Sequence, residues 1–220
     1  ERTEPVTMIG PRGLEHVVSC LRVVAPELPF PIEFIELTEP SVSITIRDYV
    51  ITAYRVQHAI TTYGYAVEIP RAGRFQVERA EALGLPVRTW GLLQKGETVE
   101  FEGETYYPEM VMGPPRKGLK VAYCTDSRPT RSIVEGARGA DLFICEGMYG
   151  DPDCLDKARA YKHTTMQESA RMAAEAEIPP REMWYTHYSP SLTNPKQYIG
   201  EMQAIFPHAR CGRDGMTAEL

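Results

Sequence analysis

Residues 119–149 read LKVAYCTDSRPTRSIVEGARGADLFICEGMY, and this stretch decides the fold class. It holds two short apolar runs, 119–124 and 141–146, with the length and composition of buried strands. Between them lies RSIVEGA (131–137), whose apolar residues are spaced as in a short helix. A strand, a loop, a helix and a second strand in this order indicate a layered α/β domain.

The pattern changes on either side of this stretch. Upstream, apolar and polar residues alternate with period two, which predicts antiparallel strands. The upstream elements that we expect are strands over 6–9, 32–37, 43–56, 63–69, 99–102 and 106–112, and helices from Leu14 and over 77–83. Downstream we expect helices over 151–161, 165–177 and 195–206 and strands over 182–188 and 215–220.

The composition of the 220 residues is that of a globular domain, with 43% hydrophobic and 25% charged residues. A membrane span is excluded, because runs such as 141–145 are far shorter than the roughly 18–20 residues that a span needs. The net charge of −6 excludes a whole-surface nucleic-acid binder, so any RNA contact must be local. Five scattered cysteines without a CxxC pair exclude a thiolate zinc finger and are typical of a reducing cytoplasm.

Polar residues follow the predicted buried strands at the edge where α/β folds place their active sites. Asp126 follows KVAYC, Glu146 ends DLFICE, His187 follows EMWYT, and His58 follows AYRVQ. Imidazole and carboxylate are the ligands of zinc hydrolases, in which water keeps an open position. The alternative is structural: such residues also cap helices and close turns, and no HExxH pair decides between the two interpretations.

Six short motifs in a fixed order carry a resemblance to a known family. They are QHAITTYGYAVE (57–68), YCTDSRPT (123–130), ADLFICEGMY (140–149), KHTTMQESA (162–170), YTHYSP (185–190) and RDGM (213–216). Together they resemble the ribonuclease Z family, the tRNA 3′-end-processing branch of the metallo-β-lactamase superfamily. The resemblance covers almost all of residues 1–220. It implies an α/β fold, the metallo-β-lactamase αβ/βα four-layer sandwich, of which this chain would form the C-terminal portion.

The resemblance also implies roles for individual residues. His58 and His187 match histidines that each complete one zinc site, and Asp126 matches the carboxylate that bridges the two zinc ions. His163 matches a residue that helps to protonate the leaving 3′ oxygen. Glu146 would orient His163 or a ligand histidine; a buried carboxylate paired with an arginine is the alternative. The implied reaction is zinc-dependent hydrolysis of precursor tRNA that leaves a 3′ hydroxyl, with two zinc ions per active site.

Residues 70–97 match in position the arm with which bacterial members of the family grip the tRNA elbow. Residues 71–96 contain five basic and two acidic residues, a net charge of +3, which leaves −9 for the remainder of the chain. Such a local reversal of charge favours phosphate contact. The RNA-binding residues that we predict are Arg71, Arg74, Arg88, Arg128 and Ser189. An ordinary solvated insertion is the alternative for the arm, and a surface or turn role is the alternative for Arg128 and Ser189.

The HxHxDH signature of the family, which supplies most of its zinc ligands, occurs nowhere in the 220 residues. Three ligands cannot build a two-zinc site, so we expect a C-terminal portion of a longer enzyme, a partner chain that carries HxHxDH, or an inactive protein. The family also implies a homodimer. The alternative functions are hydrolysis of a small phosphodiester or ester on the same fold, and a non-catalytic scaffold or fragment without metal.

Overall fold

The computed structural model describes residues 2–220 and divides the chain into two compact units. One unit runs to Glu68 and resumes at Lys120, and the other is Ile69–Leu119. The first unit contains every predicted metal-binding and catalytic residue.

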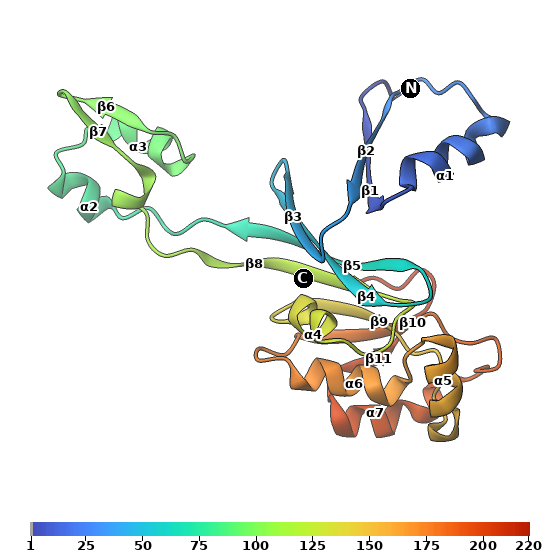
Figure 1. Ribbon diagram of the computed structural model, residues 1–220. Coiled ribbons are helices and arrows are strands. Elements are labelled where there is room, and N and C mark those ends of the chain that lie inside the picture. Colours follow the sequence, from blue (N-terminus) through green and yellow to red (C-terminus); the bar gives the residue numbers. More distant parts are fainter. Residues whose placement is uncertain (1) are drawn as a thin grey trace. The chain divides into compact units, whose positions relative to one another are not determined.

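The first unit is built on a seven-stranded sheet with the order β11-β10-β9-β8-β5-β4-β3 (Figure 1). These strands are β3 (Ser41–Ile46), β4 (Tyr49–Gln57), β5 (Thr61–Arg71), β8 (Arg116–Cys124), β9 (Leu142–Glu146), β10 (Glu182–Thr186) and β11 (Ala209–Cys211). β3, β4 and β5 are antiparallel, whereas β8 to β11 run parallel. In the parallel half Cys124 pairs with Cys145, and Thr186 with Glu146, so the carboxyl ends of β8, β9 and β10 lie at one edge.

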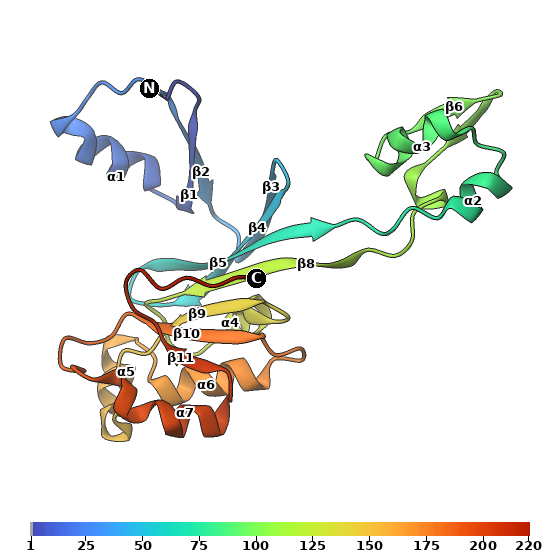
Figure 2. The ribbon, with the colours of Figure 1, turned by 180° about the vertical axis from the view of Figure 1, so that it is seen from behind.

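Helices cover one face of this sheet (Figures 1 and 2). They are α4 (Arg131–Ala137), α5 (Leu155–Tyr161), α6 (Met166–Glu175) and α7 (Ile199–Ile205), with 3₁₀ turns η3 (Pro152–Cys154) and η4 (Pro195–Tyr198). α6 buries Met166, Ala170 and Ala173, which recur at helical spacing and face the sheet core of Phe143 and Tyr185. Because α6 contacts both α4 and α7, it is the central helix of the layer.

Two glycines allow close packing around Tyr54 of β4. A Cβ atom added at Gly64 of β5 would lie 2.4 Å from the Tyr54 ring, and one added at Gly136 of α4 would lie 2.5 Å from it. The Tyr54 hydroxyl donates to the carbonyl of Tyr123 at 3.3 Å. Only glycine leaves room for this ring between strand and helix, which brings α4 close to the sheet.

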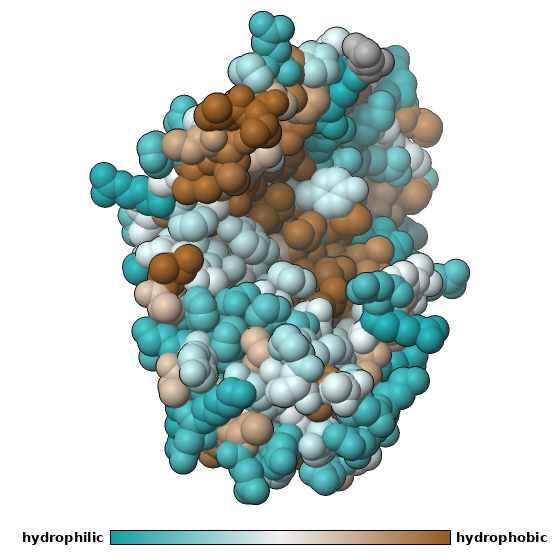
Figure 3. Space-filling view, turned by 90° about the vertical axis from the view of Figure 1, so that its right-hand side faces the viewer, coloured by the Kyte–Doolittle hydropathy of each residue, from teal (hydrophilic) through white to brown (hydrophobic). Residues whose placement is uncertain are grey.

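The N-terminal elements form a small β-α-β unit. β1 (Val6–Pro11) pairs in parallel with β2 (Ile32–Leu37), and α1 (Leu14–Leu21) and the 3₁₀ turn η1 (Arg22–Val24) connect them. Leu37 packs with Ala53 and Tyr63 of the large sheet. Apolar side chains gather over α1 and η1 in the space-filling view, where Leu21, Val23 and Val24 are exposed (Figure 3).

The second unit has its own small core. It contains α2 (Val77–Ala82), α3 (Val87–Gln94), the hairpin of β6 (Val99–Phe101) and β7 (Glu104–Tyr106), and the 3₁₀ turn η2 (Pro108–Met110). Its core consists of Ala80, Leu85, Leu93, Val99 and Val111. The predicted arm, residues 70–97, lies inside this unit, and its RNA-binding role stays a prediction.

Several predicted elements differ from the observed ones. The run 43–56 is a hairpin rather than one strand, because Arg47, with φ 54°, turns the chain between β3 and β4. Residues 215–220 form no strand; the last strand is β11, whose three residues are too few to give a period-two signal. Of the strand predicted over 106–112, only Tyr106 lies in a named strand, β7, and Pro108–Met110 form η2; α3 was not predicted at all. Within residues 2–220, no helix is both long and apolar enough to cross a membrane.

Candidate metal centre

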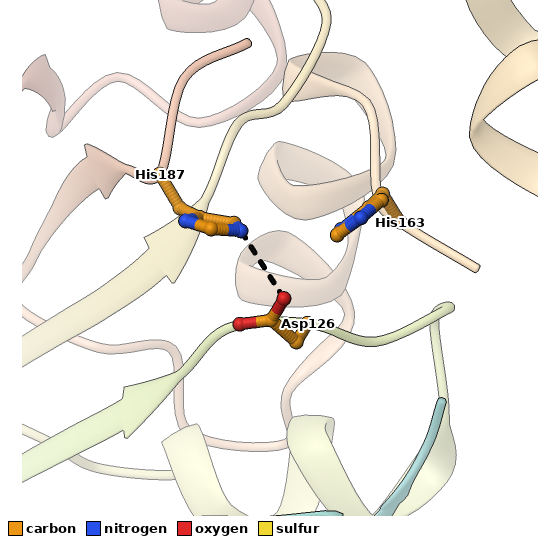
Figure 4. Close-up of side chains that lie close together, drawn as sticks. All are labelled: Asp126, His163 and His187. Carbon is orange, nitrogen blue, oxygen red and sulfur yellow. Dashed lines mark ion pairs between the residues drawn. The ribbon is translucent and has the colours of Figure 1, made fainter. Parts of the chain in front are cut away.

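Asp126 and His187 meet at the carboxyl edge of the parallel strands. Asp126 follows β8 and His187 follows β10, and His187 Nε2 lies 3.2 Å from a carboxylate oxygen of Asp126 (Figure 4). Both residues have left-handed backbones, with φ of 55° and 54°. A non-glycine residue in this conformation is strained, and such strain gathers at functional sites. The two turns direct both side chains toward one point.

His163 is the third member of the cluster. It lies in the loop between α5 and α6, after Lys162 ends α5 in the left-handed conformation with φ 59°. One donor atom from each of Asp126, His163 and His187 lies within 4.8 Å of the other two (Figure 4). His163 is 14% exposed, whereas His187 is 40% exposed. Imidazole and carboxylate are donor types that zinc prefers, so the cluster offers candidate ligands for a metal ion and a histidine beside it.

Glu146, at the end of β9, holds His163 in place. Its Oε1 accepts the backbone N–H groups of Ser127 and Thr164 at 3.0 and 2.9 Å, and its Oε2 lies 2.9 Å from His163 Nδ1. Because Oε1 accepts two N–H groups and the carboxylate is only 1% exposed, Nδ1 of His163 is the donor to Oε2. This tautomer leaves Nε2 of His163 as the free ring nitrogen.

His58 lies beside the cluster rather than in it. Its ring centroid is 5.3 Å from that of His163, which in turn lies 5.6 Å from that of His187. His58 Nδ1 lies 3.1 Å from the carbonyl oxygen of Lys162, to which it can only donate. A ring N–H that donates to a backbone carbonyl is typical of histidines that bind a metal through the other nitrogen.

Comparisons with known proteins find relatives over the whole chain. The chain is 54% identical over 220 residues to a ribonuclease Z from Agathobacter rectalis and 52% identical to one from Lachnoclostridium phytofermentans. Each alignment covers all 220 residues of this chain and 72% of the length of the relative. No family model matches the chain.

The chain belongs to the ribonuclease Z family. The resemblance expected from the six motifs is therefore confirmed. The short form of human tRNase Z, at 17% identity, aligns with 98% of this chain and 68% of its own, with a TM-score of 0.58. Zn²⁺-bound PqqB from Methylobacterium extorquens, also at 17% identity, aligns with 98% of this chain and 63% of its own, with a TM-score of 0.56.

These structural matches confirm the predicted fold. The human enzyme shares it, and so does the metallo-β-lactamase fold protein YhfI from Bacillus subtilis, with a TM-score of 0.59 over 96% of this chain and 64% of its own. In this ribonuclease Z family member, the parallel half of the sheet supplies Asp126, Glu146 and His187, each at a strand end.

The predicted RNA-binding residues lie in both units. Arg71, Arg74 and Arg88 are exposed in the second unit, and the Arg88 guanidinium lies 5.9 Å from the centroid of the Phe101 ring. In the first unit, Arg128 pairs with Glu168, and Ser189 is buried with its Oγ 2.8 Å from Oγ of Ser191. Ser189 also donates its N–H to the carbonyl of Met148, which ties the loops after β9 and β10 together.

Three residues near the cluster were not predicted from the sequence: Ser127, Thr164 and Glu168. Glu168 stands three residues after Thr165, the spacing of a capping box, and this signal was available in TTMQE. Cys145, beside Glu146, is not a ligand candidate: burial raises the pKa of its thiol to about 12, so the thiol stays protonated.

Proposed function

We propose that this chain carries the catalytic face of a metal-dependent endoribonuclease that cleaves precursor tRNA at its 3′ end and leaves a 3′ hydroxyl. The observation that carries the proposal is the cluster of Asp126, His163 and His187 at the strand edge of a ribonuclease Z family chain. Precursor tRNA is the substrate that the family name implies.

The residues present fit a metal centre. Asp126 and His187 would hold zinc through one oxygen and one nitrogen donor, and His58, whose ring lies 5.3 Å from that of His163, would add a second nitrogen from beside the cluster. When bound, a zinc pair supplies an activated water and offsets negative charge on the attacked phosphate. Two ions need more ligands than this chain offers, so we propose that further ligands of the HxHxDH type complete the site from elsewhere in the protein or from a partner chain.

The chain's own residues handle the proton on the leaving group. In the imidazolium form, Nδ1 of His163 donates to Glu146 and Nε2 carries the proton that would pass to the 3′ oxygen, which returns the ring to the neutral Nδ1–H tautomer. The Glu146 carboxylate accepts from Nδ1 and fixes the orientation of the ring. Asp126 holds His187 through its carboxylate oxygen, which keeps both donors aimed at the same point.

The first test is cleavage of precursor tRNA by the full-length protein before and after removal of metal. We expect cleavage at the 3′ end, loss of activity after chelation, and recovery with zinc. Asp126→Asn tests the ligand assignment, because Asn tolerates the left-handed backbone but lacks the charge. We expect zinc affinity to fall by more than the roughly 10–100-fold typical of outer-shell changes.

Asp156→Asn is the matched control, since Asp156 lies on the surface of α5, where it contacts Arg159. It should leave both metal content and cleavage unchanged. Cleavage of a small phosphodiester but not of precursor tRNA would contradict the substrate, and a folded protein that binds no zinc would favour the scaffold alternative. A homodimer and a cytoplasmic location remain proposals.

A further inference from the structure

We propose that Arg128 and Glu168 form a positioning pair, which fixes the loops that carry His58, Asp126 and His163, and that Arg128 does not contact RNA. The inference rests on the proposed function for its catalytic readout. It replaces the role that the sequence suggested for Arg128, and it gives a role to Glu168, which the proposed mechanism does not use.

Two of the three guanidinium nitrogens of Arg128 donate to protein acceptors, which leaves little of the group for a substrate phosphate. Its Nη1 donates to Glu168 Oε2 at 2.9 Å and also to the backbone carbonyl of His163, while its Nη2 donates to Glu168 Oε1. Both side chains of the pair are only 14% exposed. A bidentate arginine–carboxylate pair is rigid, so the His163 carbonyl is held at a fixed place.

Glu168 is itself anchored at the start of α6. Its Oε2 accepts the backbone N–H of Thr165 at 3.0 Å, and its own N–H donates to Thr165 Oγ1 at 3.2 Å. Burial alone would raise the pKa of Glu168, but the hydrogen bonds from Arg128 and Thr165 outweigh it and lower the pKa. The pair is therefore charged at neutral pH and linked to the helix that covers the sheet.

The backbone of Arg128 reaches the His58 loop. Its N–H donates to the carbonyl of Gln57 at 2.9 Å, and the N–H of Gln57 donates to Ser127 Oγ at 3.0 Å. His58, the next residue, then contacts the carbonyl of Lys162 at 3.1 Å. Arg128 is thus bonded to two loops at once and lies two residues from Asp126 in a third.

Displacement of these loops would change catalysis more than substrate binding. A shift of about 1 Å in reacting groups can lower a rate about 10²-fold. Loss of a phosphate contact would instead weaken the binding of precursor tRNA and reduce the dependence of that binding on salt. A variant that changes kcat but not KM therefore indicates a positioning role, and one that changes KM but not kcat indicates a phosphate contact.

The test uses the full-length protein with zinc, precursor tRNA as substrate, and the variants Arg128→Lys and Glu168→Gln. Lysine keeps the charge but cannot bond both Glu168 oxygens and the His163 carbonyl together. We expect each variant to lower kcat at least tenfold, to change KM for precursor tRNA less than twofold, and to weaken zinc binding in competition with a chromophoric chelator. The double variant should be no worse than the poorer single variant, as for residues that act as a unit.

The matched controls are Arg138→Lys and Glu177→Gln, which alter an exposed ion pair of 3.2 Å on the helical layer. They should change none of these values. A raised KM with unchanged kcat in Arg128→Lys, or wild-type kcat in Glu168→Gln, would overturn the inference. So would a kcat loss that vanishes when activity is divided by the folded fraction, measured by circular dichroism. If the wild type fails to cleave precursor tRNA, the proposed function fails, and zinc affinity still tests the positioning pair.

Discussion

At the scale of single residues, the site is marked by backbone conformation as well as by side-chain chemistry. Among residues 2–220, five non-glycine residues have positive φ, and Asp126, Lys162 and His187 are three of them. The other two, Arg47 and Glu102, lie in tight turns between paired strands. Such a conformation costs about 1–3 kcal/mol and persists only where the surroundings impose it. The network around Glu146 and Arg128 supplies those surroundings.

Glu146→Gln should uncouple His163 without unfolding the loop. The Gln carbonyl can still accept the N–H groups of Ser127 and Thr164, but its amide nitrogen cannot accept from His163 Nδ1. We expect kcat to fall about 10²-fold or more, in line with loss of a general acid, with KM nearly unchanged. The rate constant of single-turnover cleavage at saturating precursor tRNA measures this fall. Glu135→Gln, on the exposed surface of α4, is the control, and an unchanged kcat would refute the role of Glu146.

The lowered pKa of Glu168 predicts a specific dependence of stability on pH. A carboxyl whose pKa is lower in the folded than in the unfolded state stabilises the fold above its unfolded pKa. That stabilisation is lost as pH falls through the folded pKa. Glu168→Gln should therefore be less stable than the wild type near pH 7, and the difference should shrink in acid. Urea unfolding from pH 7 to pH 3 tests this, with exposed Glu175→Gln as control. A difference that is constant with pH would contradict it.

At the scale of elements, the strands around the site were predictable from the sequence. The loops and side chains that contact their ends were not. The apolar runs of β8, β9 and β10 predict buried strands. The sequence therefore places Asp126, Glu146 and His187 at the ends of these strands. That His163 joins them depends on the loop between α5 and α6, which tertiary contacts position. Arg128 looked like a phosphate ligand because sequence does not show a partner forty residues away. The antiparallel pairing predicted for the strand over 32–37 was wrong, because β2 pairs in parallel with β1 across the helical connection of α1.

Gly73→Ala should disrupt the second unit. An added Cβ atom would lie 1.9 Å from the backbone oxygen of Gly113, so the two chain segments must separate. Their separation breaks the bond from Gly113 N–H to the Arg74 carbonyl, now 2.8 Å. We expect the free energy of unfolding of the second unit to fall by about 1–3 kcal/mol, as for overpacking. Hydrogen exchange at Gln76 and Gly113 measures it.

Gly91→Ala is the control for this substitution. Gly91 lies within α3, and nothing lies within 4 Å of a Cβ atom added there. Alanine should stabilise the helix by up to about 1 kcal/mol. Equal exchange rates in Gly73→Ala and the wild type would show that the close approach of the two segments is not needed.

At the scale of the whole molecule, the candidate metal centre and the excess of positive charge lie in different units of the chain. The cluster of histidines and carboxylates lies in the first unit, and the segment 71–96, with net charge +3, lies in the second. In a chain of net charge −6, phosphate contacts must come from such a local excess. Binding and cleavage should therefore respond to different substitutions.

Replacing Arg71, Arg74 and Arg88 together with Gln tests this separation. We expect weaker binding of precursor tRNA, and a slope of log affinity against log salt that is smaller by about 2–3, as for three lost phosphate contacts. The rate at saturating tRNA should stay unchanged, because none of the three belongs to the metal cluster. Filter binding from 50 to 300 mM salt, with single-turnover cleavage alongside, measures both. The control replaces Arg131, Arg138 and Arg159, each of which already pairs with an acidic residue. An equal slope in the two triple variants would mean that the excess charge of 71–96 is an ordinary solvated surface.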